Sequence, residues 1–420
     1  MRLAPLITAM ILSSAAAQQP KYLGAGSCAS SNCHGATSAA AEQVRRTMGN
    51  EFAIWSAIDK HAVAYKGLEK PRARRMGEIL KIADVTADKR CTVCHVAGSP
   101  EKTRSDGVAC EACHGPAEQW LGTHTQPNSH AASVAKGVID TKNLLVRAQT
   151  CLGCHLGAAD TAGGKVVDHE LIAAGHPDLA FELDTFGWAQ PAHYREPKPS
   201  AGNTLPRVRV WAVGQASALA EGMHLLAAHA ANRWPEFSDL ECYQCHHDLR
   251  LESWRIQRGY PGRTPGSLQI NQARYDILRE LVAQAAPEQR EALESSMSAL
   301  AEAMSRRPCD GPAVGQAARQ IAKLAGGLAA RFDKQDFDAA GARGIVKAIG
   351  ANIQRIANSG VHSAEQAAMS LDSLTAAYEA GRQAEQNSNT AQLYDYLEHP
   401  SAYQPGEFVA RFRKAVAAVQ

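Results

Sequence analysis

The last third of the chain has the apolar spacing of amphipathic helices. Leu278 and Leu281 begin one apolar stripe, and Met297 and Met304 extend another in the next segment. Intervals of three, four and seven residues place such side chains on one face of a helix. Residues 269–420 are also rich in Ala, Glu, Gln, Leu and Arg, which favour helices. We expect five or six helices packed as a bundle, with both methionines in its core rather than bound to a metal.

Residues 18–268 follow a different pattern. Short helical stretches, such as the one expected over 51–62, alternate with scattered Gly and Pro. The Pro-rich segment 191–206 predicts an irregular connection, and the turn-forming residues 260–266 predict a boundary. The expected fold class is therefore mainly α: a loop-rich domain at 18–268 followed by an α-helical bundle domain at 269–420.

The amino terminus has the pattern of an export signal. A short basic start, Met1-Arg2, precedes apolar or small residues as far as Ala17, and Gln18 follows a run of three alanines. This pattern predicts a signal peptide at 1–17. The apolar stretch is too short for a membrane span, and no later stretch approaches eighteen consecutive apolar residues. We expect a periplasmic or otherwise exported protein with no membrane span in the mature chain.

Composition bears on two questions: whether the chain binds nucleic acid, and what fills its core. Lys and Arg number 44 against 42 Asp and Glu, so the chain lacks the basic excess of a nucleic-acid binder. Aromatic residues make up only 6% of the 420 residues, which is little for an all-protein core of this size. Large planar cofactors would supply the missing apolar area.

Ten of the eleven cysteines lie in five motifs that end in histidine. Four have the form Cys-x-x-Cys-His, and the first has four residues between its cysteines. In chain order the five motifs are Cys28/Cys33/His34, Cys91/Cys94/His95, Cys110/Cys113/His114, Cys151/Cys154/His155 and Cys242/Cys245/His246. Such cysteine pairs form thioethers to haem, and the adjacent histidine becomes the proximal iron ligand. The sequence therefore predicts five covalently attached c-type haems.

Disulfides and structural zinc are the alternatives for these cysteines. Neither requires a histidine directly after every second cysteine, so both fit the four short motifs poorly. For Cys28 and Cys33 a local disulfide remains the alternative. Cys309 lies outside the motifs and is expected to be a buried thiol, although a dimerising disulfide, and hence an oligomer, is also open.

Eleven further histidines compete for at most five distal positions. We expect His61 and His124 to be distal ligands, the latter for a neighbouring haem rather than its own. His169 and His176 are seven residues apart, a spacing that suits two adjacent irons if the segment is helical. The sequence leaves open whether His224, His229 or His247 is a ligand. The others are expected to be surface or structural residues: His130, His193, His362 and His399.

These motifs resemble a family of multihaem c-type cytochromes. Its best-known member is the periplasmic tetrahaem cytochrome that accepts electrons from hydroxylamine oxidoreductase. The resemblance is carried by Cys110-Glu-Ala-Cys113-His114-Gly-Pro with Trp120 and His124, and by the first motif with Trp55 and His61. It implies a largely helical electron carrier with mostly bis-His haems, in which His61 and His124 match distal positions. A fifth motif, a longer first motif and the C-terminal helices depart from the tetrahaem type.

Two functions follow from a row of closely packed haems. The first is electron transfer between redox proteins, as donor and acceptor partners. The second is an oxidoreductase that acts on a small nitrogen or sulfur compound at one haem with an open coordination position. No Cys-x-x-Cys-Lys motif marks such a haem here, so electron transfer is favoured and no catalytic residue is assigned.

Overall fold

The computed structural model describes residues 20–41, 47–98, 103–158, 164–195, 197–258, 266–306, 310–378 and 388–418. The predicted signal peptide, most of the predicted boundary at 260–266 and Cys309 lie outside the described residues. In the described part, helices dominate, and β-pairing is limited to isolated bridges such as Ala158 with Lys165. The prediction of a mainly α fold is confirmed.

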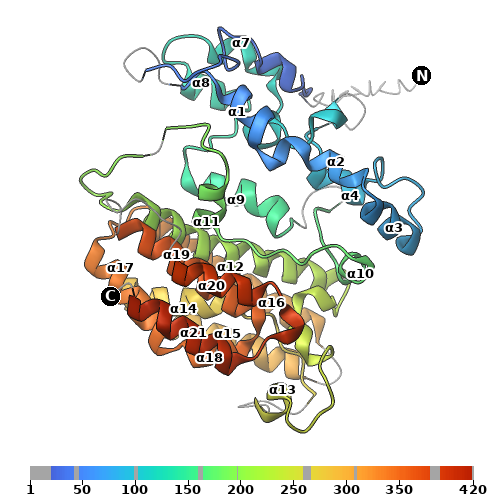
Figure 1. Ribbon diagram of the computed structural model, residues 1–420, viewed down its shortest axis with the longest axis vertical. Helices are drawn as coiled ribbons and strands as arrows, with labels where there is room; N and C mark the ends of the chain where they lie inside the picture. The colour runs from blue at the N-terminus through green and yellow to red at the C-terminus, as the bar shows by residue number, and fades with distance from the viewer. Residues whose placement is uncertain are drawn as a thin grey trace, which may run out of the picture.

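The first part of the chain forms short helices joined by loops and 3₁₀ turns (Figure 1). Their bounds are α1 (Glu51–Ile58), α2 (Ala64–Leu68), α3 (Pro71–Leu80), α4 (Lys89–His95), α6 (Cys110–His114), α7 (Leu121–His124), α8 (His130–Ala135), α9 (Leu144–His155), α10 (His169–Ala174) and α11 (Leu183–Ala189). In Figure 1, α9 lies between α1 above and α11 and α12 below.

The rest of the chain is built from longer helices that pack together below α9 (Figure 1). They are α12 (Pro206–Asn232), α13 (Trp254–Arg258), α14 (Ala273–Ala285), α15 (Arg290–Ser305), α16 (Gly311–Phe332), α17 (Ala339–Ala351), α18 (Ile353–Ser359), α19 (Val361–Tyr378), α20 (Ser388–Leu397) and α21 (Pro405–Ala418). The described residues after 269 thus hold eight α-helices. The expectation of five or six helices was wrong because helix boundaries at Asn352 and Gly360 divide a segment that its apolar periodicity predicts to be continuous.

A single hydrophobic core links helices from both predicted domains. Leu152 of α9 and Trp211 of α12 belong to the same buried cluster as Met297 and Met304, so both methionines pack in the core as expected. Trp211 is completely buried, and its indole Nε1 donates a hydrogen bond to Ser370 Oγ at 3.1 Å. The domain boundary at 268 stays a prediction, but helices on both sides of it share one core.

Candidate haem-binding site

Three of the short motifs lie at the carboxyl ends of helices. α4 ends at His95, α6 at His114 and α9 at His155. Asp88 accepts a hydrogen bond from Arg90 N at the start of α4, and Asn143 accepts from Leu145 N at the start of α9. Residues three and four apart share a helix face, so each helix presents both thiols and the imidazole together. The fifth motif begins with a 3₁₀ turn over Cys242–Gln244. All ten motif cysteines are free thiols.

Four of the five motif histidines face a second imidazole. In every case the second ring belongs to one of the four histidines expected to be distal ligands. The facing pairs, with the distance between ring centroids, are His34 with His124 (6.3 Å), His155 with His61 (6.0 Å), His95 with His176 (6.5 Å) and His246 with His169 (6.1 Å). His124 thus faces His34 of the first motif and not the third motif, which it follows in the chain.

Carboxylates hold two of these imidazoles. His34 Nδ1 donates to Glu51 Oε2 at 3.0 Å, and His61 Nδ1 donates to Asp59 Oδ1 at 2.9 Å. Burial opposes ionisation of both carboxyl groups, but hydrogen bonds from these rings and from backbone N–H groups lower the pKa of Glu51 and of Asp59 to about 2. Both carboxylates are therefore charged at neutral pH.

Backbone carbonyls hold three other imidazoles in the same way. His95 Nδ1 donates to Ala64 O at 2.9 Å, and His176 Nδ1 donates to Pro177 O at 2.8 Å. His124 Nδ1 donates to Leu121 O. With Nδ1 occupied, each ring keeps Nε2 for another partner, which is the arrangement that orients histidines toward metals.

His61 and His176 reach their positions through breaks in helices. The helix expected over 51–62 ends at Ile58 because the Asp59 side chain accepts from His61 N at 2.9 Å instead of continuing the helix. α10 ends at Ala174, and the next residue, Gly175, has a φ of 115°, a conformation that favours glycine. His169 therefore lies on the helix and His176 beyond it, and the two face different motifs.

Thiols of different motifs also meet. The Cys28 thiol is within hydrogen-bonding contact of the Cys110 thiol, and the Cys94 thiol is within such contact of Cys154. Burial, followed by the nearby thiols of the fourth motif, raises the pKa of Cys113 to about 12. The first motif thus lies beside the third, the third beside the fourth and the fourth beside the second.

Comparison with known proteins places the first three motifs. A family model described as cytochrome c554 and c-prime matches residues 27–115. This segment is therefore similar to that family. The chain is also similar to a curated protein named cytochrome c-554 from Nitrosomonas europaea, with 30% identity over 114 residues, which are 23% of this chain and 48% of the relative. It therefore spans about half the length of that relative. No solved structure matches.

The length and polarity of the helices bear on whether any of them could span a membrane. None of the helices in the described part of the chain is long and apolar enough to span a membrane. The longest helix of the described part is α12, and many of its apolar residues are buried in the shared core.

The three histidines that the sequence left open have other environments. His229 is buried, and its Nδ1 donates to Asp239 Oδ2 at 2.8 Å. His224 is exposed on α12, and His247 Nδ1 donates to the neighbouring Asp248 O at 2.6 Å. None of these three rings faces a motif histidine within the described residues. Burial lowers the pKa of His114 to about 4, so this motif histidine is neutral at pH 7.

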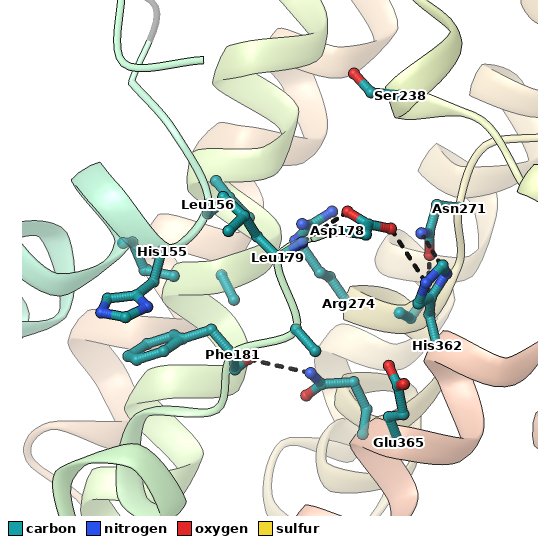
Figure 2. A pocket seen from close by; sticks show the side chains of 15 residues that line it. His155, Leu156, Asp178, Leu179, Phe181, Ser238, Asn271, Arg274, His362 and Glu365 are labelled. Atoms are coloured by element: carbon teal, nitrogen blue, oxygen red, sulfur yellow. Dashed lines mark hydrogen bonds and ion pairs between the residues drawn. The ribbon is translucent and has the colours of Figure 1, made fainter. Parts of the chain in front are cut away.

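A small cavity separates the fourth motif from the bundle. Figure 2 shows His155 at one side of it, with the ring of Phe181 stacked on the imidazole at a centroid distance of 4.8 Å. The opposite wall is polar: His362 Nε2 lies 3.1 Å from Asp178 Oδ2, and Arg274 points into the space between (Figure 2). Asp178 and His362 also group with Cys242, within reach of a common metal ion, but Cys242 belongs to the fifth motif.

Sequence reasoning did not identify the carboxylates Glu51 and Asp59. Each lies within the segment that follows the first motif, but an acidic residue there is ordinary on a helix surface. The one available signal was the position of Asp59, two residues before His61, because a short polar side chain at that spacing accepts a hydrogen bond from the backbone N–H.

Proposed function

We propose that the chain is a periplasmic electron carrier with five covalently attached c-type haems, four of them ligated by two histidines. The single observation that carries this proposal is the set of four facing imidazole pairs. A metal–imidazole bond is about 2 Å long, so one iron between two Nε2 atoms separates the ring centroids by roughly 6.3 Å. The observed range is 6.0 to 6.5 Å, and the residues present therefore fit the group.

Cysteine and histidine side chains would hold the haems in different ways. The ten motif cysteines provide thioether bonds, and the five motif histidines provide proximal ligands: His34, His95, His114, His155 and His246. His124, His61, His176 and His169 provide the second axial nitrogen for the first, fourth, second and fifth motifs. When bound, the haems supply iron centres that take up and release single electrons.

Contacts between motifs support a single file. The contacts between thiols support the order first, third, fourth and second motif. The fifth joins the second because His169 and His176 lie on one short segment and face His246 and His95. Neighbouring sites in such a file lie close enough for electrons to pass between them, which favours transport over isolated catalysis.

The two ends of the file suit contact with redox partners. His246 and Cys245 are exposed, unlike the buried or half-buried cysteines and histidines of the third and fourth motifs. The first motif, at the other end, has a His34 side chain that is 27% exposed. A donor protein at one end and an acceptor at the other would each meet an accessible site. The periplasmic location rests on the predicted signal peptide at 1–17.

The number of haems is tested by intact mass and by a pyridine haemochrome assay on purified protein. Five haems per chain are expected. Replacement of both Cys28 and Cys33 by Ser should leave four, whereas Cys309→Ser, outside every motif, should keep five. Four haems in the wild type would refute the assignment of the first motif, and protein without covalently bound pigment would refute the function.

Axial ligation is tested by electron paramagnetic resonance. His61→Ala should convert one low-spin haem to high-spin, because Nε2 of His61 is lost opposite His155. His224→Ala is the matched control, since that ring is exposed on α12 and faces no motif histidine. An unchanged spectrum for His61→Ala would remove this residue from the ligand set.

One observation favours the alternative function. Within the described residues, His114 has no facing imidazole at the distance of the four pairs. An open position there would admit a small nitrogen or sulfur compound. Binding of nitrite, hydroxylamine, sulfite or nitric oxide to the oxidised or reduced protein, followed by turnover, would support an oxidoreductase.

A further inference from the structure

The segment from Gln190 to Arg195 is fixed at both ends to the neighbours of the third motif. At one end, Gln190 Nε2 donates to Asp59 Oδ2 at 3.2 Å, and Asp59 holds His61. His61 in turn faces His155 of the fourth motif. This end of the segment therefore lies beside the fourth motif.

The other end lies beside the first motif. Arg195 Nη2 donates to Ala40 O at 2.6 Å and to Thr47 O at 3.4 Å. Ala40 follows His34 by six residues in the same loop. Tyr194 is held as well, because the Arg147 guanidinium lies over its ring at 5.5 Å from the centroid. The segment thus runs from the neighbourhood of the fourth motif to that of the first, and the third motif lies between these two.

His193 occupies the middle of the segment, and its ring is prepared as the other ligand rings are. The side chain is half-buried, and Nδ1 donates to Pro191 O at 3.3 Å. His95, His124 and His176 make the same kind of Nδ1 bond to a carbonyl. This bond leaves Nε2 of His193 available toward the third motif.

Other histidines are committed elsewhere. His130 Nε2 lies 3.4 Å from Asp140 Oδ1, and His229 and His362 pair with Asp239 and Asp178.

We propose that His193 is the second axial ligand of the haem held by Cys110, Cys113 and His114. The proposal rests on the proposed function, because it assumes a haem at the third motif. It completes a set of five histidine pairs and closes the one position at which a small substrate would bind. The sequence expectation that His193 is a surface or structural residue is replaced by this assignment.

The experiment compares spin states and haem content in full-length holoprotein. Wild-type protein is expected to show five low-spin haems and no high-spin signal in electron paramagnetic resonance. His193→Gly should keep five haems by mass, show one high-spin haem, and regain the low-spin spectrum on addition of imidazole. His224→Gly, which removes an exposed ring of α12 that faces no motif histidine, should change neither measurement.

Three results would overturn the proposal. One is a stoichiometric high-spin haem in the wild type, and another is an all-low-spin spectrum in His193→Gly. If that variant fails to accumulate, His193→Met decides, since a methionine–iron charge-transfer band must appear and its absence in folded protein overturns the assignment. A haem count below five refutes the proposed function instead, so the two failures are distinguishable.

Discussion

The carboxylate of Asp59 should lower the reduction potential of one haem, and its removal is the sharpest test of the ligand assignments. Asp59 is 5% exposed and ionised, with a pKa near 2, and it accepts from His61 Nδ1 at 2.9 Å. A negative charge on this hydrogen bond favours the more positive, oxidised iron. Asp59→Asn keeps the shape and the acceptor oxygen but removes the charge.

The magnitude follows from distance. An iron on Nε2 lies about 4 Å from Nδ1 across the ring, so the carboxylate is roughly 7 Å from it. Coulomb's law with an effective dielectric constant of about 20 gives ~2.4 kcal/mol for unit charges at this distance. This energy corresponds to a rise of about 100 mV in the potential of a one-electron couple. The side chain is 3% exposed, so screening by salt is weak.

The assay is a potentiometric titration followed by visible absorption and electron paramagnetic resonance. One of the five midpoint potentials should rise by about 100 mV. Glu51→Gln should raise a different one, because Glu51 holds His34. Asp395→Asn, at an exposed position of α20, is the charge-matched control and should leave all five unchanged. A shift below about 30 mV in Asp59→Asn, or a downward shift, refutes the reasoning.

Three further predictions concern stability. Burial opposes the charged form of His229, but the hydrogen bond to Asp239 raises its pKa, so the stabilisation is complete below about pH 6.5 and is lost as the pH rises through the folded-state pKa. The melting temperature should therefore fall between pH 6 and pH 8, and His229→Gln should reduce this fall. An equal fall in the wild type and the variant would contradict the prediction. Gly360→Ala should destabilise by about 1–3 kcal/mol, because φ is 135° and a Cβ would lie 2.7 Å from Glu241 Oε1; urea unfolding measures the loss, and a neutral result would show that the site relaxes. Leu300→Ala removes a fully buried side chain of α15 and should cost about 2–5 kcal/mol in the same assay, whereas an effect under about 1 kcal/mol would mean that the core is not packed there.

The candidate attachment residues can be read from the sequence because covalent haem chemistry requires a fixed spacing. Two thiols and a histidine must be adjacent in sequence, so the motifs are visible without a structure. Distal ligands have no such constraint, because they come from loops or helices far along the chain. The context of His61 and His124 near the early motifs predicts them as distal ligands, but no local pattern predicts that His124 faces His34 rather than another ring.

Other features depended on tertiary contacts that periodicity does not encode. The apolar pattern around His61 predicts a continuous helix, yet the Asp59 side chain captures the backbone and ends α1. His193 lies in a Pro-rich connection, where a histidine is usually exposed. Only the bonds of Gln190 and Arg195 show that this connection is held between two separate segments, one before the second motif and one next to the first.

The bundle and the haem-bearing helices cannot be separated by a simple cut. α9 carries the fourth motif at its end, while its Ala148 and Leu152 pack in the cluster that includes α12 and the helices after residue 269. A shortened protein lacking those helices would leave this apolar surface in water, at a place directly behind a cofactor. A shortened version of this chain would therefore need polar residues on that surface of α9, or it would have to keep the helices that cover it.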